Sequence, residues 1–190
     1  MKTVEPPRIP LKGAPIWPLS VAAYRVLGEA GLIPKNTELL YGFVYQKMSK
    51  SPLHSALVSR LLRLIREILP PGFLLRSEQP LTCSDSEPEP DVSVIRGREE
   101  DFWDEHPNTA ELVIEVCLGS YDYDSSKLRA YALSEVKECW LVLPREKKIE
   151  AHRKPRNGEY TQKQTYGPVG RIRSSALPRI DLQLDRILRR

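Results

Sequence analysis

The chain has 190 residues, of which 41% are hydrophobic and 28% are charged, a composition typical of one folded domain and unlike that of disordered chains. Its net charge of +4 is compatible with a nucleic-acid partner, and equally with a basic surface that binds none. No apolar run approaches the ~20 residues that a membrane-spanning helix needs, so we expect no membrane partner.

The cysteines favour a reducing compartment. Cys83, Cys117 and Cys139 are odd in number, and they form no close pair of the C-x-x-C type. The N-terminus is proline-rich and polar, which is unlike a secretion signal. We therefore expect buried, reduced thiols in a cytoplasmic protein.

The chain begins with a segment of little periodicity. Residues 1–17 contain four prolines, so we predict an extended N-terminal arm ahead of a single domain over residues 18–190. The domain opens with a predicted helix, which has Ser20 as its N-cap and ends at Gly31.

The next segments alternate between strand and helix patterns. Residues 38–48 are predicted to form a strand or one arm of a hairpin, with a bend at Gly42. A second helix is predicted over residues 51–69, where an apolar stripe recurs at helical spacing. Residues 70–72, Pro-Pro-Gly, end this helix, and a strand is predicted over residues 73–81.

The second half of the chain is richer in strand patterns. A helix is predicted from Asp124, its N-cap, to about Ser134. Strands are predicted over residues 89–95, 112–118 and 138–143, a hairpin over residues 148–164, and a strand or short helix over residues 177–188. The order of these elements predicts an α+β fold, in which helices flank a mixed β-sheet.

One strand contains a residue that needs a chemical explanation. Glu115 lies in the middle of the apolar run Leu112–Leu118. A buried carboxylate is costly unless a cation, a metal ion or a proton neutralises it. Glu115 is therefore the first candidate for a functional site, although a buried arginine or lysine could also pair with it.

A second acid is predicted to lie beside Glu115. If strands 89–95 and 112–118 are antiparallel neighbours, a register centred on Trp103 places Asp91 opposite Glu115. Directly opposed side chains lie ~4.5–5.5 Å apart at Cβ, a distance at which two carboxylates repel. One divalent cation between them would remove the repulsion. Alone, Asp91 would be typical of a turn after Pro90.

A basic residue follows in the first turn of the next predicted helix. Lys127 lies close enough to the end of the strand to reach Glu115, although it could instead pair with Asp124 on the helix surface. Two carboxylates and an ammonium at one sheet edge suit metal-assisted hydrolysis of a phosphodiester. Mg²⁺ would sit on the acids, with Mn²⁺ able to substitute for it.

Several motifs in this order resemble those of a known family. They are Glu38–Gly42, Met48-Ser49, His54, Pro88–Val92, Leu112–Val116, Tyr123-Asp124, Lys127, Tyr131-Ala132 and Glu138–Trp140. The chain is similar here to the Uma-type restriction-endonuclease family of the PD-(D/E)XK nuclease superfamily. The resemblance covers nearly the whole chain from Leu19 onward and implies a restriction-endonuclease-like fold.

The resemblance implies a role for each matching residue. Asp91 matches the acid of the Pro-Asp motif, and Glu115 matches the acid of the (D/E)XK motif. The lysine of that motif would fall at Cys117, which cannot perform its chemistry, and Lys127 on the following helix takes the corresponding place. Glu38 matches an acid that joins the metal site from an earlier element.

Further residues are weaker candidates. The Val116 carbonyl is a possible third ligand of the metal ion. His54 could contact the scissile phosphate or a nearby water, although a histidine at a helix start is more often structural. Asp122 and Asp124 could be additional ligands, but loop and N-cap roles fit them better.

Three function classes remain open at this point. The first is a Mg²⁺-dependent endonuclease that cleaves DNA and acts as a homodimer, because two copies of one site can cut both strands of a duplex. The second is a non-catalytic module that binds nucleic acid or a partner protein. The third is an acid–base hydrolase such as a glycosidase, which the lysine near the carboxylates disfavours.

Overall fold

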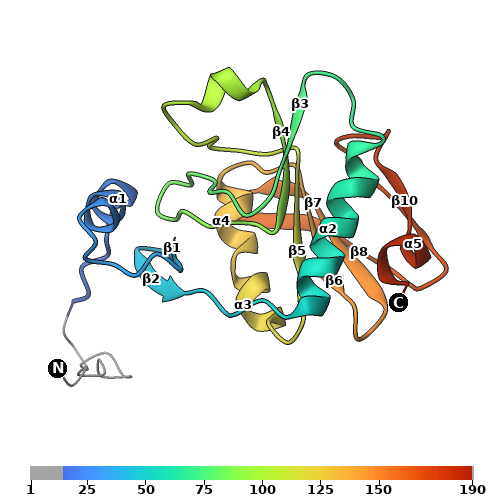
Figure 1. The fold of residues 1–190 in the computed structure, drawn as a ribbon, viewed down its shortest axis with the longest axis horizontal. Helices are drawn as coiled ribbons and strands as arrows, with labels where there is room; N and C mark the ends of the chain where they lie inside the picture. Colours follow the sequence, from blue (N-terminus) through green and yellow to red (C-terminus); the bar gives the residue numbers. More distant parts are fainter. Residues whose placement is uncertain (1–14, 190) are drawn as a thin grey trace.

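The centre of the molecule is a six-stranded mixed sheet, and the computed structural model describes residues 15–189 around it (Figure 1). Residues 1–14 of the expected N-terminal arm lie outside this described part. The sheet consists of β3 (Phe73–Arg76), β4 (Val92–Arg96), β5 (Leu112–Val116), β6 (Glu138–Leu143), β7 (Lys148–Arg156) and β8 (Glu159–Tyr166), in that spatial order. The predicted α+β class is confirmed.

The one parallel pair of this sheet fixes the position of the helices near Glu115. Strands β5 and β6 are parallel, whereas the other neighbouring pairs are antiparallel. Parallel strands need a crossover connection, and the helices α3 (Tyr121–Ser126) and α4 (Leu128–Leu133) supply it. The crossover therefore returns over the sheet directly after the strand that contains Glu115.

Two apolar layers cover the two faces of the sheet. On one face, Leu61 and Ile65 of α2 (Pro52–Arg66) pack in a cluster with Ile114 and Trp140. The short helix α5 (Leu184–Leu188) completes this layer, and it follows a small sheet formed by β9 (Arg171–Arg173) and β10 (Asp181–Gln183). On the other face, Tyr131 of α4 packs in a second cluster.

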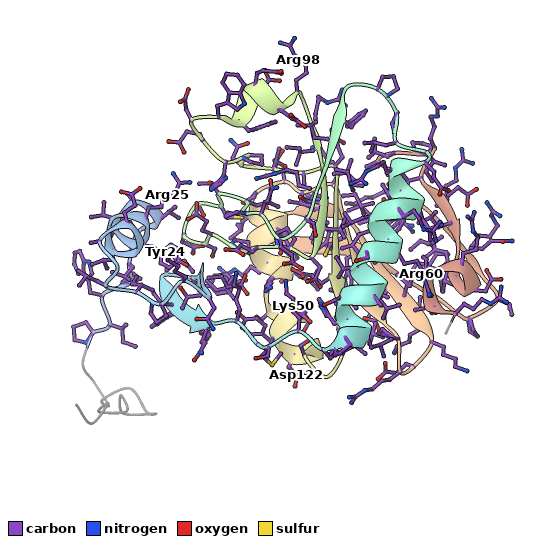
Figure 2. The ribbon with its side chains drawn as sticks, viewed as in Figure 1. Tyr24, Arg25, Lys50, Arg60, Arg98 and Asp122 are labelled. Atoms are coloured by element: carbon purple, nitrogen blue, oxygen red, sulfur yellow. The ribbon has the colours of Figure 1, made fainter. Side chains whose placement is uncertain are left out.

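The N-terminal elements lie to the side of the sheet (Figure 1). They are the helix α1 (Val21–Glu29) and a hairpin formed by β1 (Thr37–Leu40) and β2 (Phe43–Gln46). Tyr24 and Arg25, labelled in Figure 2, fasten α1 to the rest: Tyr24 Oη donates to the Thr37 carbonyl over 3.0 Å, and Arg25 pairs with Glu87 over 2.6 Å.

Most of the predicted elements are confirmed, and the others need correction. Residues 38–48, predicted as a strand or one hairpin arm, contain both arms of a hairpin with its turn at Tyr41-Gly42. The strand predicted over residues 73–81 ends at Arg76, because Glu78 has a positive φ of 54° that breaks an extended chain. The helix predicted from Asp124 begins at Tyr121 instead, and it is interrupted at Lys127 between α3 and α4. The C-terminal segment contains both alternatives, strand β10 and helix α5, and β9 was not predicted.

The three cysteines lie in the described part and are buried free thiols. None of the helices that the structure describes is long and apolar enough to cross a membrane.

Candidate active site

The register between β4 and β5 determines where the two predicted acids meet. Val92 pairs with Ile114, so the pairing is antiparallel and centred as expected. Val92 and Ile114 point into the α2 layer, and the side chains of alternate residues must then point to the opposite face. Asp91 and Glu115 therefore share the other face.

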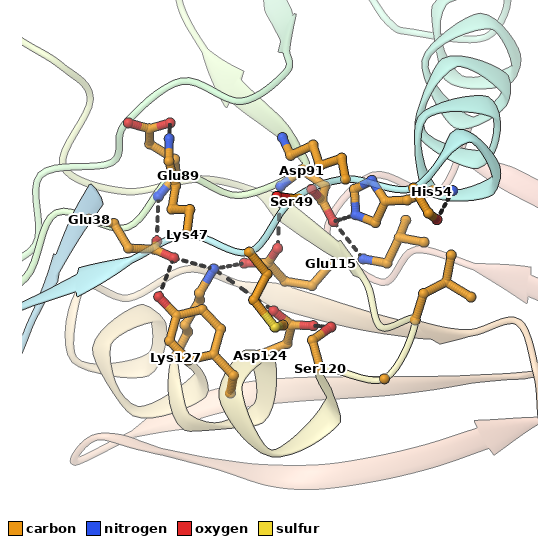
Figure 3. Close-up of a pocket in the computed structure, with 17 residues that line it drawn as sticks. Glu38, Lys47, Ser49, His54, Glu89, Asp91, Glu115, Ser120, Asp124 and Lys127 are labelled. Carbon is orange, nitrogen blue, oxygen red and sulfur yellow. Dashed lines mark hydrogen bonds and ion pairs between the residues drawn. The ribbon is translucent and has the colours of Figure 1, made fainter. Parts of the chain in front are cut away.

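Glu115 is almost fully buried and has three neighbours, of which Figure 3 draws Lys127 and Asp91. Its side chain is 2% exposed, and it accepts hydrogen bonds from the Tyr131 hydroxyl over 2.6 Å and the Asp91 N–H over 3.3 Å. The ammonium of Lys127 lies 3.4 Å from Oε1. The buried charge thus has a cation and two donors, as the sequence analysis required.

Asp91 immediately precedes β4 and faces the end of β5. Its Oδ2 accepts a 2.8 Å hydrogen bond from the Val116 N–H, and the Nε2 of His54 lies 3.1 Å from the same oxygen. Among the described residues, no hydrogen bond reaches its Oδ1. One carboxylate oxygen thus fixes the orientation of the side chain, and the other is free to bind a ligand.

Lys127 lies at the junction of α3 and α4, where the chain turns its side chain inward. Its Nζ is 3.0 Å from Glu38, 3.4 Å from Glu115 and 3.9 Å from Asp124, and it lies 5.1 Å from the centre of the Tyr123 ring. The side chain is only 5% exposed. Three carboxylates from three elements therefore surround one ammonium.

Asp124 does not serve as the predicted N-cap. It lies inside α3, where its carboxylate accepts a hydrogen bond from the Ser120 hydroxyl and turns toward Lys127. Ser120 precedes the first residue of the helix, but its side chain makes no capping hydrogen bond, because its hydroxyl donates to Asp124. The N-cap preference alone does not distinguish these two positions.

Glu38 supports Lys127, and His54 supports Asp91. Glu38 lies on β1 and accepts hydrogen bonds from the Tyr123 hydroxyl over 2.7 Å and the Glu89 N–H over 3.0 Å, beside its ion pair with Lys127. His54 lies in the first turn of α2 and contacts Asp91. Its Nδ1 is buried and has no hydrogen-bond partner in the described part of the chain.

Burial and neighbouring charges shift the pKa values of Glu115 and Lys127. Desolvation raises the pKa of Glu115 to about 8, and the charges of Asp91 and Asp124 add to this effect against the opposing ammonium of Lys127. Burial alone would lower the pKa of Lys127, but Glu115, Glu38 and Asp124 raise it above its usual value. The pKa of Glu115 is thus raised mainly by its burial, and the pKa of Lys127 by the carboxylates around it.

Cys117 does not replace the missing lysine of the (D/E)XK pattern. Burial raises the pKa of its thiol, so it remains neutral. The ammonium arrives from Lys127 instead, which lies within 3.4 Å of the Glu115 carboxylate. The expectation that this lysine reaches the end of the strand is confirmed.

These side chains line a cavity of about 170 Å³ that opens to the surface. The segment Lys47–Ser51 borders it on one side, and Gly119 and Ser120 border it on the other. The ion pair between Lys47 and Glu89 lies at its rim (Figure 3). The opening allows a ligand to approach Asp91, whereas Glu115 and Lys127 are more deeply buried in its wall.

The donor set suits a hard cation that keeps part of its water shell. The part of the chain that the structure describes has no group of three or more His, Cys, Asp or Glu side chains placed to enclose a metal ion. Asp91 and Glu115 provide two carboxylates, and Mg²⁺ is usually held by one or two carboxylates together with waters and substrate phosphates. A closed site of the zinc type does not fit these residues.

Two tyrosines support acids of the site in ways that were not predicted from the sequence. Tyr131 donates to Glu115, and Tyr123 donates to Glu38. Tyr131 follows Lys127 by four residues and therefore lies on the same helical face, a spacing that could have indicated it. Tyr123 gave no such signal, because its partner lies on a hairpin 85 residues away.

The comparisons with known proteins identify the family and agree with the fold. The model of the Uma2 family, described as "Putative restriction endonuclease", matches residues 33–185. A solved structure, that of "a putative nuclease belonging to DUF820" from Anabaena variabilis, is similar with a TM-score of 0.69 and 21% sequence identity. The match covers 85% of this chain and 96% of that one. A search of the curated proteins finds no match.

Proposed function

From the membership of this chain in the Uma2 restriction-endonuclease family, we propose that it is a metal-dependent endonuclease that hydrolyses phosphodiester bonds of DNA. One observation carries the proposal: Asp91 and Glu115 share a sheet face at the cavity, beside the buried ammonium of Lys127. Two acids and a lysine in this arrangement suit the hydrolysis of an anionic ester.

The metal site would consist of oxygen ligands. Asp91 Oδ1, the carboxylate of Glu115 and the Val116 carbonyl would hold Mg²⁺, or Mn²⁺ in its place. When bound, the ion would supply charge to the phosphate and acidify a water molecule. Because burial raises the pKa of Glu115, this carboxyl group must lose its proton before it can bind a cation.

Lys127 would stabilise the negative charge that develops on the phosphate. Its raised pKa keeps the ammonium charged at neutral pH, so it can donate hydrogen bonds to a phosphate oxygen or to the attacking water. It would act as a fixed cation and not as a base. Glu38 holds the ammonium in place through a 3.0 Å contact.

His54 would orient Asp91 and would not contact the substrate. Its Nε2 lies 3.1 Å from Oδ2, the oxygen that also accepts the Val116 N–H. A hydrogen bond to one carboxylate oxygen directs the other oxygen toward a ligand. Carboxylates that bind metal ions are commonly held by such hydrogen bonds from neighbouring side chains.

We also propose that the protein acts as a cytoplasmic homodimer in which residues 18–190 form one domain. Hydrolysis of both strands of a duplex needs two cleavage events, and two copies of one site related by a two-fold axis can provide them. The net charge of +4 is compatible with binding of the DNA backbone.

Plasmid cleavage tests the proposed chemistry. Supercoiled plasmid is incubated with the protein in Mg²⁺, Mn²⁺ or EDTA, and nicked and linear products are measured over time. We expect cleavage with either metal and none in EDTA, and a loss of at least about 100-fold in Asp91→Asn. The control is Asp122→Asn, since Asp122 is exposed and does not line the cavity; it should cleave like the wild type.

Two results would contradict the proposal. Equal cleavage by wild type and Asp91→Asn would mean that the activity does not come from this site. DNA binding without cleavage in any metal would identify a non-catalytic binding module that retains the fold.

A further inference from the structure

The hairpin formed by β1 and β2 has one closed edge and one open edge. All four residues of β1 are buried, and Leu39 bridges to Glu87 on the side away from β2. All four residues of β2 are exposed, and within the described chain no strand pairs with its outer edge. An unpaired edge strand is a template for pairing with another chain.

The backbone of β2 offers hydrogen bonds at this open edge. Phe43 pairs with Leu40 across the two-residue turn Tyr41-Gly42, and the pair that closes such a turn exchanges both of its hydrogen bonds. The direction of these backbone groups alternates along a strand, so the N–H and C=O groups of Tyr45 also point toward β1. The N–H and C=O groups of Val44 and Gln46 point outward.

The side chains of β2 are uncharged, and Phe43, Val44 and Tyr45 are exposed hydrophobic residues, unlike those of the edge strand β8. Phe43 is 42% exposed, Val44 36% and Tyr45 42%. Pro18 packs against Gly42, which places the 92% exposed Trp17 beside the hairpin turn. By contrast, β8 presents a polar and charged sequence, Glu-Tyr-Thr-Gln-Lys-Gln-Thr-Tyr, as edges that avoid association do.

The hairpin and α1 depend on contacts outside themselves: β1 is buried against the domain, whereas β2 and α1 keep exposed surface. A two-stranded hairpin is marginally stable in water, and a helix of nine residues is too short to be stable alone. None of the residues of α1 is buried. Figure 1 shows α1 and the hairpin projecting from the side of the main sheet, where a second molecule can approach them.

Two occupants could cover the edge: the N-terminal segment of the same chain, or a second copy. Residues 1–14 include prolines at positions 6, 7 and 10. A proline has no N–H and is excluded from strand pairing except at edges, so this segment is a poor partner. A two-fold axis instead brings β2 against itself, and β2 has no charged residue that would repel its copy.

We propose that β2 pairs antiparallel with β2 of a second copy, so that the two hairpins form one four-stranded sheet. Of the two-fold registers, the one with Tyr45 opposite the partner's Tyr45 places Val44 opposite the partner's Gln46. This register pairs the outward N–H and C=O groups of Val44 and Gln46 in each chain, whereas the neighbouring two-fold registers pair fewer of these groups. Tyr45 faces its copy at a non-hydrogen-bonded position, where Cα atoms lie ~4.5 Å apart.

This interface lies close to the candidate active site. Tyr45 pairs with Glu38 in the hairpin, and its ring lies 6.0 Å from that of Tyr123. The proposal rests on the homodimer proposed above and not on the cleavage chemistry. Oligomeric state and cross-linking are measured without substrate, so their failure would leave the proposed hydrolysis untouched.

Disulfide cross-linking tests the register. Tyr45→Cys is oxidised mildly in the full-length protein and analysed on a non-reducing gel. We expect a reducible dimer band, because the two thiols face each other and the three native cysteines are buried. The matched control is Gln162→Cys on the exposed strand β8, which should remain monomeric on the gel. Cross-linking of Gln162→Cys but not of Tyr45→Cys would overturn the proposal.

Sedimentation velocity tests the interface independently. The wild type should sediment with twice the 21.7 kDa mass of one chain. Val44→Pro removes an N–H that β1 does not use and should be monomeric, whereas Val44→Thr keeps the N–H and should remain dimeric. If Val44→Pro fails to fold, the cross-link decides the question. A monomeric wild type, the result expected if residues 1–14 cover the edge, would overturn the proposal, as would a dimer unchanged by Val44→Pro.

Discussion

At the scale of single residues, the site is determined by the cost of burying Glu115. A carboxylate that is 2% exposed is compatible with folding only because Tyr131, Lys127 and the Asp91 N–H surround it. Asp91 and Asp124 add further negative charge, so the apo cluster takes up a proton at Glu115. The same excess charge is what a divalent cation would neutralise.

This proton makes the stability of the metal-free protein depend on pH. The folded pKa of Glu115 is about 8, above its ordinary value of 4.5, so the folded state binds the proton more tightly than the unfolded state. Its contribution to the free energy of unfolding is full below pH 4.5 and is lost as pH rises to about 8. We expect urea denaturation in EDTA to show this loss, and Glu115→Gln to remove it; identical pH profiles would contradict the shift.

Removal of the central cation should be costly. Lys127→Met leaves Glu38, Glu115 and Asp124 buried without their common ammonium, so we expect a loss of about 3–5 kcal/mol in the free energy of unfolding at pH 8. The loss should be smaller at pH 5, because the carboxyl groups can then take up protons. The control is Lys137→Met, an exposed residue whose loss should cost less than about 0.5 kcal/mol. Equal stability of both variants at pH 8 would refute this account.

At the scale of elements, the site depends on segments that are far apart in sequence. The register of β4 against β5 follows from alternation of apolar residues, which is why the sequence predicted it correctly. The helix start at Tyr121 could not be predicted, because Ser120 and Asp124 both satisfy the usual N-cap preference. The contact of Tyr123 with Glu38 depends on how the hairpin docks, and local periodicity does not encode that.

The junction between α1 and the hairpin depends on one glycine. Gly42 has a φ of +78°, and a Cβ atom there would lie 2.2 Å from the Pro18 Cβ. We expect Gly42→Ala to lower the free energy of unfolding by about 1–3 kcal/mol, from the strained φ and the clash. Gly28→Ala is the control: it lies in α1 with nothing within 4 Å, and it should keep or raise stability. Urea denaturation of both variants makes the comparison, and equal effects would contradict this role of Gly42.

At the scale of the whole molecule, the fold brings four separate parts of the chain to one cavity. They are the hairpin with Glu38, the start of α2 with His54, the paired ends of β4 and β5, and the junction at Lys127. The sequence predicted the class of the fold and these site residues, because buried charge and motif order both indicated them. It did not predict the separation of β1 and β2 from the main sheet, since a strand pattern does not specify its partner.

The central claim is that Asp91 and Glu115 together bind a divalent cation, and Mn²⁺ affinity tests it most directly. Titration calorimetry at pH 8 compares the wild type with Glu115→Gln and with the exposed control Asp122→Asn. We predict that Glu115→Gln binds Mn²⁺ at least about tenfold more weakly, because a neutral amide replaces one of two carboxylate ligands. Asp122→Asn should bind like the wild type. Unchanged Mn²⁺ affinity in Glu115→Gln would contradict the metal site.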